Sequence, residues 1–93
     1  MITFVIEFEP DYIEMRRIFV TGGAHGIGQA IVEAFVKEGD KMAFCDINKE
    51  LGEKVAAETG ARFFLLDVCD KTALEKAVQT LFDEWGDLDI IVN

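Results

Sequence analysis

The sequence predicts an α/β fold in which helices cover both faces of a parallel sheet. From Arg16 onward, short apolar runs of strand length alternate with longer segments in which apolar residues recur at helical spacing. The 93 residues suffice for one domain, and 51% hydrophobic and 29% charged residues with a single proline are typical of a packed globular chain. The expected element order is therefore βαβαβαβ, with four strands in a doubly wound sheet.

The four expected strands are apolar along most of their length, as parallel strands must be when helices cover both of their faces. Each run ends in a polar residue. The runs span Arg16–Thr21, Lys41–Asp46, Arg62–Asp67 and Leu88–Asn93.

Helical spacing is clearest in the last connection, where apolar residues at offsets 0, 3, 4, 7, 8 and 11 form a stripe wide enough to cover a sheet face. Asp70 is the expected cap at the start of this helix and Gly86 the expected cap at its end. The stripe consists of Leu74, Ala77, Val78, Leu81, Phe82 and Trp85.

The other two connections also carry apolar residues three and four positions apart, which predicts two more helices. The first is expected to end at Gly39, and the second, which is shorter, to run from a cap at Asn48 to Gly60. The apolar positions are Ile27, Ile31, Ala34 and Phe35 in the first helix and Leu51, Val55 and Ala56 in the second.

Residues 1–14 do not fit the alternating pattern. Pro10 and four acidic residues, with no basic residue among them, separate an Ile/Phe/Val run from the first clear strand. Met15 is a natural start for the domain, which is expected to span residues 15–93. An added edge strand, a tag-like extension and a misassigned start codon are equal alternatives for the segment before it.

Charge and hydropathy exclude several classes of partner. Eighteen acidic against nine basic side chains give a net charge of −9, which repels phosphate backbones and anionic lipid surfaces, so nucleic acid and membrane are not expected partners. No apolar run approaches the roughly 18 to 20 residues of a membrane span. The apolar opening lacks the basic residues of a secretory signal, and two cysteines without such a signal indicate reduced thiols and a cytoplasmic protein.

The residue types that are missing restrict the chemistry. The chain has no serine, its only tyrosine is Tyr12 and its only histidine is His25. Hydroxyl-nucleophile triads and metal sites built from several histidines are thereby excluded.

The strongest local motif is Thr21-Gly-Gly-Ala-His-Gly-Ile-Gly28, which falls between the first expected strand and the first expected helix. Gly22 and Gly26 would let the chain turn sharply and let a pyrophosphate approach the backbone, and Gly28 would let the helix pack closely on the strand. The helix N-terminus adds amide donors and a partial positive charge. The motif predicts a dinucleotide site on a Rossmann-type sheet of strand order 3-2-1-4.

A second feature falls where a dinucleotide site requires it. Asp46 ends the second expected strand, 18 residues after Gly28, where a carboxylate accepts hydrogen bonds from the adenosine ribose hydroxyls. Its charge repels the 2′-phosphate of NADP, by about 4 kcal/mol for two unit charges 4 Å apart at an effective dielectric of 20, so NAD is the expected cofactor. Ile47 supplies no compensating cation, whereas His25, if protonated near the site, would weaken the discrimination; an exposed loop residue is the alternative interpretation of His25.

These residues, with Leu66-Asp67-Val68 after the third strand and Leu88–Asn93 in the fourth, closely resemble the short-chain dehydrogenase/reductase family from Arg16 to Asn93. The resemblance implies a homo-oligomer for the full-length family protein. It also implies that Asp67 accepts a hydrogen bond from the adenine, although a cap on the following turn is an alternative role. The cofactor-binding residues that it implies are Gly22, Gly26, Ile27 and Gly28 at the pyrophosphate, Asp46 and Ile47 at the ribose, Asp67 and Val68 at the adenine, and Asn93 beside the cofactor.

The chain also departs from the family. The proton chemistry of the family needs a serine and a Tyr-x-x-x-Lys pair, and neither is present; Tyr12 precedes the first strand and is followed four residues later by Arg16. Asn93 corresponds to the first residue of the family's Asn-Asn-Ala-Gly motif, which indicates a fragment. The 93 residues alone are therefore predicted to be inactive.

The leading hypothesis is the NAD(H)-binding portion of an oxidoreductase that transfers hydride between nicotinamide and an alcohol or carbonyl substrate. The alternative is a non-catalytic, truncated module that binds a nucleotide or a partner through the edge of the sheet. A third hypothesis is another nucleotide-binding protein of the same fold, such as a methyltransferase or a flavoprotein.

Overall fold

Four parallel strands form one sheet in the computed structural model, which describes residues 15–92. The strand order is β3-β2-β1-β4, so the predicted doubly wound α/β arrangement is confirmed. The extension 1–14 and Asn93 lie outside the described residues. The strands are β1 (Arg17–Thr21), β2 (Lys41–Asp46), β3 (Arg62–Leu65) and β4 (Ile90–Val92).

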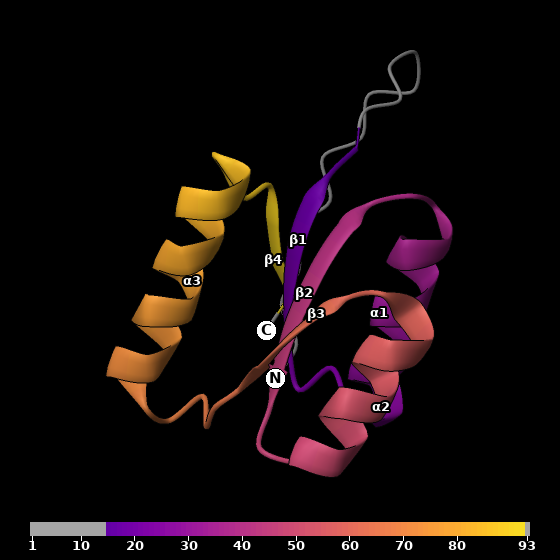
Figure 1. Ribbon diagram of the computed structural model, residues 1–93, viewed down its shortest axis with the longest axis horizontal. Helices are drawn as coiled ribbons and strands as arrows, with labels where there is room; N and C mark the ends of the chain where they lie inside the picture. The colour runs from indigo at the N-terminus through magenta and orange to yellow at the C-terminus, as the bar shows by residue number, and fades with distance from the viewer. Residues whose placement is uncertain (1–14, 93) are drawn as a thin grey trace.

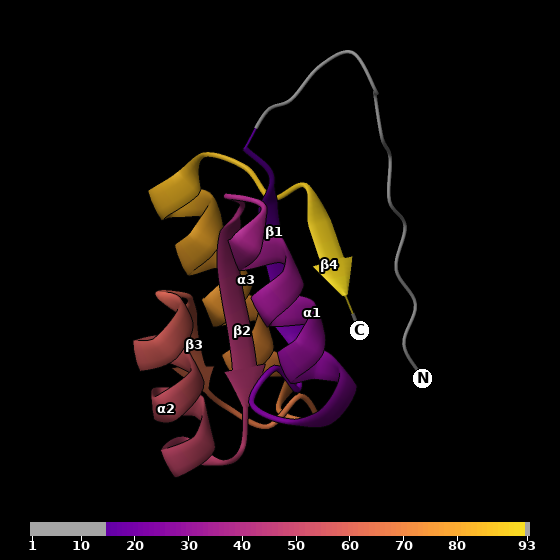
Figure 2. The same ribbon diagram turned by 90° about the vertical axis from the view of Figure 1, so that its right-hand side faces the viewer.

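Helices lie on both sides of this sheet. Two of them, α1 (Gly26–Lys37) and α2 (Lys49–Thr59), cover one face, and α3 (Lys71–Trp85) covers the other (Figure 1). A quarter turn of the molecule shows the strands side by side, from β3 on the left to β4 on the right, with α1 and α2 in front of the sheet and α3 behind it (Figure 2). In residues 15–92, no helix is long and apolar enough to cross a membrane.

Local capping fixes the ends of α2 and α3 as predicted. The side chain of Asn48 accepts a hydrogen bond from the amide of Leu51, and that of Asp70 accepts one from the amide of Ala73. Gly60 and Gly86 end these helices in the left-handed conformation, with φ of 78° and 82°, which glycine adopts without steric penalty.

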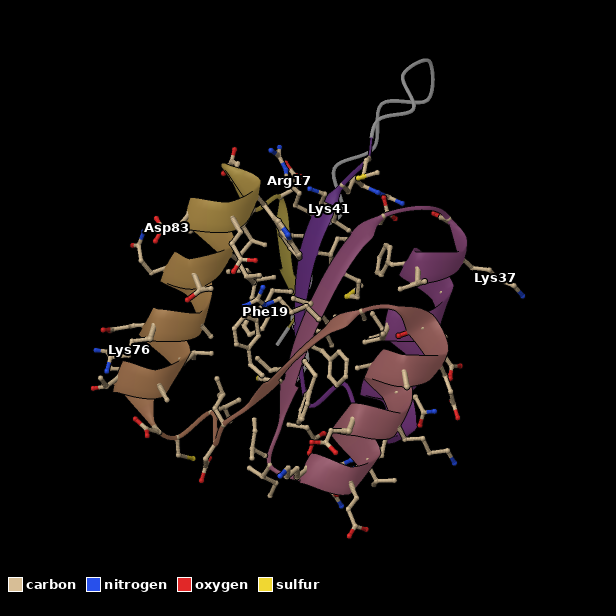
Figure 3. The ribbon with its side chains drawn as sticks, in the orientation of Figure 1. Arg17, Phe19, Lys37, Lys41, Lys76 and Asp83 are labelled. Carbon is tan, nitrogen blue, oxygen red and sulfur yellow. The ribbon has the colours of Figure 1, made fainter. Side chains whose placement is uncertain are left out.

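The core divides into two clusters because side chains of a strand alternate between the sheet's faces. Under α1 and α2, Phe44 stacks on Phe63 with ring centroids 5.2 Å apart. Under α3, Phe19 meets Phe64 edge to face at 6.2 Å and Leu81 is fully buried. Figure 3 shows Phe19 on the side of the sheet that faces α3.

Ion pairs fasten the amino end of β1 to its neighbours. Arg16 pairs with Asp40 at 2.9 Å, just before β2, and Arg17 pairs with Asp89 at 2.9 Å, just before β4. The hydrogen bond from the Arg17 side chain holds the pKa of Asp89 below its ordinary value. Arg17 and Lys41 mark this end of the sheet in Figure 3, opposite to the carboxyl ends of the strands.

Two strands are shorter than predicted. The expected third strand reaches Asp67, but β3 ends at Leu65, which lies opposite Asp46, the last residue of its only partner strand. The expected fourth strand begins at Leu88, but β4 begins at Ile90; just before it, Asp89 contacts Arg17 through both its side chain and its backbone amide. Single backbone hydrogen bonds, from Leu66 to Asp46 and from Asp89 to Arg17, continue beyond these strands without extending them.

The face of α1 that packs on the sheet also differs from the prediction. Ile27 is 67% exposed and Ala34 is exposed, whereas Val32 is fully buried between Ile31 and Phe35. On α3, Phe82 lies at the margin of the predicted stripe and is 40% exposed.

We expect neighbouring truncations on α3 to differ sharply. Leu81→Ala should lower the free energy of unfolding by about 2–5 kcal/mol because it opens a cavity under α3. Phe82→Ala, one residue further along the same helix, should cost about 1 kcal/mol or less. Urea denaturation followed by circular dichroism measures both, and equal losses would contradict the described packing of α3.

Candidate functional site

The glycine-rich loop between β1 and α1 lies at the carboxyl end of the sheet and is fastened to the end of β2. The amides of Gly22 and Gly23 both donate to the carbonyl oxygen of Cys45, at 2.8 and 3.2 Å. Gly22 and Gly26 have φ of 70° and 60°, which L-residues with a side chain rarely adopt. A Cβ at either of these two positions would meet no atom within 4 Å, so their backbone faces open space.

Gly28 brings α1 into close contact with this loop. A Cβ at this position would lie 2.8 Å from the carbonyl carbon of Gly22 and 3.2 Å from the Cα of Gly23. Gly28 was expected to let the helix pack closely on the first strand, and the close contact is instead with the loop that follows this strand. It also explains the orientation of α1, because the side of the helix that carries Gly28 must rest on the loop, which leaves Ile27 in solvent.

The sequence reasoning missed two residues of this loop. Gly23 lies over Phe44, whose Cβ would be only 2.5 Å from a Cβ at Gly23. Ala24 is 1% exposed, and its amide donates to the carboxylate of Asp46 at 3.1 Å. The placement of two adjacent glycines directly after a buried strand was the only available signal for Gly23, and no sequence signal marks a backbone donor such as Ala24.

The first turn of α1 offers backbone amides for an anion. His25 precedes the helix but makes no side-chain cap, whereas α2 and α3 both have one. The first turn of α1 contains no acidic residue. Amides of a first helical turn have no partner within the helix, and the helix dipole adds positive potential there. An anionic group is therefore favoured beside Gly26 and Ile27.

Asp46 is the buried charge of the site. Its side chain is only 2% exposed, and its two oxygens accept from the amides of Ala24 and Asn48 at 3.1 and 3.0 Å. The third neighbour is His25, whose Nδ1 lies 3.4 Å from Oδ2 of Asp46 and whose side chain is 65% exposed. A carboxylate has about four acceptor positions, so these contacts leave capacity for a further donor.

The remaining candidates lie around the ends of β2 and β3. Ile47 is 72% exposed and Val68 is 45% exposed, so both present apolar surface to solvent. Asp67 is exposed, and its Oδ1 accepts from the amide of Cys69 at 2.8 Å, which is the turn-capping role given as its alternative. Its Oδ2 has no hydrogen-bond partner within the described part of the chain. Asn93 lies beyond that part.

Neither metal nor thiolate chemistry is supported at the site. Within residues 15–92 there is no group of three or more metal-ligating side chains. Burial raises the pKa of the Cys45 thiol to about 11, so this thiol is neutral near pH 7 and is a poor nucleophile. The arrangement instead combines amide donors for an anion with a carboxylate acceptor for hydroxyl groups.

Comparison with known proteins gives a consistent result. The family model described as short chain dehydrogenase matches residues 16–93. A sorbitol dehydrogenase from Cereibacter sphaeroides is 42% identical over 83 residues, which is 87% of this chain and 32% of that relative. A zerumbone synthase from Zingiber zerumbet is 35% identical over 85 residues, again 87% of this chain and 32% of the relative. The chain thus spans about a third of the length of these relatives.

Solved structures show the same architecture. A short-chain dehydrogenase from Streptomyces avermitilis matches with a TM-score of 0.75 and 27% identity, covering 82% of this chain and 29% of that one. A 3-ketoacyl-(acyl-carrier-protein) reductase from Brucella melitensis, complexed with NADH, matches with a TM-score of 0.74 and 28% identity. That match covers 80% of this chain and 31% of the reductase.

The close contact at Gly28 should make Gly28→Ala destabilising, although helix propensity alone favours alanine. In an unobstructed helix, Gly→Ala stabilises by about 1 kcal/mol. Here Gly28→Ala should instead lower the free energy of unfolding by about 1–3 kcal/mol, because the new methyl group meets the backbone of Gly22. Gln29→Ala, the next residue on α1, serves as a control and should change stability little. Stabilisation by Gly28→Ala in urea denaturation would contradict the close packing.

Proposed function

Because the chain belongs to the short-chain dehydrogenase family, we propose that it is the NAD(H)-binding portion of an oxidoreductase that transfers hydride between nicotinamide and an alcohol or carbonyl group. Its role in that reaction is to hold and orient the adenosine and pyrophosphate parts of the cofactor. The similar proteins include a sorbitol dehydrogenase and a reductase in complex with NADH, which favours a nicotinamide cofactor and a hydroxyl or carbonyl substrate.

The observation that carries the proposal is the hydrogen bond between the amide of Ala24 and the carboxylate of Asp46. It joins the glycine-rich loop, which is suited to an anion, to the residue that is suited to a ribose diol. Both halves of a dinucleotide-binding site are therefore held as one unit at the carboxyl end of the sheet, where ligands of parallel α/β folds bind.

The residues present fit NAD. The open backbone at Gly22 and Gly26 and the free amides of the first turn of α1 suit the pyrophosphate. Asp46 suits the ribose hydroxyls, Ile47 and Val68 supply apolar surface beside the adenine, and Oδ2 of Asp67 is available to its amine. When bound, NAD⁺ supplies the hydride acceptor.

The charge at the site favours NAD over NADP. Asp46 carries a negative charge, and the neighbouring Ile47 offers no cation to a 2′-phosphate. Two unit charges 4 Å apart at an effective dielectric of 20 interact by about 4 kcal/mol, which solvent at the exposed Ile47 side reduces. The direction of the preference follows from the sign of the charge.

The 93-residue chain alone is not expected to catalyse the reaction. The proton chemistry of this family needs a serine and a Tyr-x-x-x-Lys pair. The chain contains no serine and no Tyr-x-x-x-Lys sequence. The hydride-transfer activity therefore belongs to the full-length family protein. A cytoplasmic location and a homo-oligomeric full-length protein stay predictions.

Binding of NADH by the 93-residue chain tests the proposal. We expect NADH titrated into the chain to show saturable binding by calorimetry, and we expect no oxidation of alcohols when the chain is supplied with NAD⁺. Gly26→Ala should weaken binding at least about tenfold, because a side chain at a φ of 60° displaces the amides of the first helical turn. Gly39→Ala is the matched control, since Gly39 also has a positive φ and open surroundings but lies beyond the other end of α1.

Two results would contradict the proposal. One is the absence of saturable NADH binding by a chain that is folded by circular dichroism. The other is equal weakening of binding by the two glycine substitutions, since strain alone would then explain the effect.

Ile47→Arg should shift the cofactor preference toward NADPH. Ile47 is 72% exposed, so the substitution leaves the core intact and adds a cation beside Asp46. The ratio of the dissociation constants, NADPH over NADH, should fall about 3- to 30-fold, as expected for one charge-assisted contact to a phosphate. Ile47→Met controls for loss of the branched side chain, and an equal ratio in the two variants would contradict the assignment of the ribose to this position.

A further inference from the structure

One border of the sheet is left without a neighbour in the described part of the chain. β4 is the last strand in the order β3-β2-β1-β4, and within residues 15–92 it pairs only with β1. Figure 2 shows β4 at the outer border of the sheet. Ile91, in the middle of β4, is 49% exposed, whereas Ile90 and Val92 on either side of it are buried. This edge therefore presents apolar surface to solvent.

The backbone of Ile91 also points to the open side. Ile91 lies opposite Phe19 in the parallel register, and the carbonyl oxygen of the next residue, Val92, accepts from the Thr21 hydroxyl of β1 at 3.3 Å. Successive residues of a strand alternate in the direction of their hydrogen bonds, so the amide and carbonyl of Ile91 point away from β1. An antiparallel neighbour would satisfy both groups through one opposite residue.

The two borders of the sheet differ in how they are protected. Charged side chains are one device by which edge strands avoid further pairing. At the other border, β3 begins at Arg62, which forms an ion pair with Glu84 of α3. β4 contains no charged residue. The β4 edge is therefore the border that is suited to a further strand.

The segment before β1, which lies outside the described residues, has the sequence pattern of such a strand. Residues 3–8 (Thr-Phe-Val-Ile-Glu-Phe) consist mostly of β-branched and aromatic residues. In an extended chain, Phe4, Ile6 and Phe8 share one side. Pro10 and Asp11, which follow, are residue types that favour turns.

The connection to β1 is long enough to reach the far side of β4. The amino ends of β1 and β4 lie together, because Arg17 pairs with Asp89 at 2.9 Å. A strand beyond β4 would lie two strand spacings from β1, about 10 Å. Residues 9–15 can span up to about 23 Å when extended. This connection permits an antiparallel neighbour, whereas a parallel crossover needs about a dozen residues or more.

We propose that residues 3–8 pair antiparallel with β4 of the same chain and cap the free edge of its sheet. Ile6, at the centre of the apolar side, lies opposite Ile91 and exchanges both backbone hydrogen bonds with it. Phe4 and Phe8 then lie diagonal to Ile91 on the same face, within reach of its exposed side chain. The cap forms with or without a bound cofactor and is therefore independent of the proposed function.

Hydrogen exchange of backbone amides, followed by NMR on the 93-residue chain, tests whether the edge is covered. The Ile91 amide should exchange at least about tenfold more slowly than the Leu65 amide. Leu65 is the matched reference at the other border. The amide of Leu66 donates to Asp46 of β2, so the amide of Leu65 points away from β2.

Two proline variants test whether residues 3–8 provide the protection. Ile6→Pro removes the amide that faces Ile91, and it should make the Ile91 amide exchange about as fast as the Leu65 amide. Ile13→Pro, in the connection, is the control and should leave the Ile91 amide protected. Circular dichroism confirms that both variants are folded.

A disulfide identifies the occupant of the edge. Opposed residues of an antiparallel pair lie within the Cα separation that a disulfide requires, so Ile6→Cys is combined with Ile91→Cys. The control combines Ile6→Cys with Leu65→Cys, because Leu65 is 54% exposed at the other border. Both chains also carry Cys69→Ala, which removes the exposed native thiol. After oxidation with oxidised glutathione, only the first pair should form a disulfide, and non-reducing electrophoresis should place it within the monomer.

Each contrary result overturns the proposal. An Ile91 amide that exchanges as fast as the Leu65 amide shows an uncovered edge, and protection that persists in Ile6→Pro shows a different cover. A disulfide between two chains assigns the edge to a second copy of the chain. If the first cysteine pair forms no disulfide, or if the control pair links equally well, residues 3–8 are not the specific occupant of β4.

Discussion

The hydrogen bond from the Ala24 amide to the Asp46 carboxylate is the constraint on which the rest of the site depends. Both groups are almost completely buried, and removing the carboxylate would leave a buried amide without a partner at a cost of about 1–3 kcal/mol. The bond, together with the two loop amides that donate to Cys45, fixes the path of the chain from β1 into α1. The direction of the α1 N-terminus, and with it the place where an anion is favoured, follows from this path.

The same constraint explains features that look unrelated in the sequence. Because the loop packs closely against the end of β2, a side chain at Gly23 would clash with Phe44. A side chain at Gly28 would clash with the backbone of Gly22. The approach at Gly28 sets the rotation of α1, so Val32 is buried and Ile27 is exposed beside the loop. An apolar residue that periodicity assigns to the core thus remains at the surface of the site.

Much of this fold was predictable because its signals are local. The caps at Asn48 and Asp70 and the glycines that end α2 and α3 follow from residue types whose preferred backbone or hydrogen bond is satisfied within a few residues. Strand order followed from the glycine motif, which is typical of one sheet topology. The ends of β3 and β4 and the buried face of α1 were not predictable in this way. The strand ends depend on contacts with the neighbouring strand, and the buried face of α1 depends on which backbone the helix touches. The spacing of apolar residues predicts neither. Spacing from the glycine motif singled out Asp46 as a candidate, whereas no sequence signal marked the Ala24 amide that donates to it.

Asp46 has a structural role, and the proposed function gives it a selective role as well. Its carboxylate holds the glycine-rich loop and the start of α2 through two backbone amides, so any substitution that alters cofactor choice at this residue also disturbs the fold. Ile47 follows Asp46 in the chain and is 72% exposed, and His25 lies 3.4 Å from the Asp46 carboxylate with its side chain 65% exposed. A charge introduced at either position would alter the electrostatic potential at the proposed ribose site without removing a buried hydrogen bond. Under the proposed function, selectivity would therefore be easier to change at these exposed neighbours than at Asp46, whose carboxylate also supports the fold.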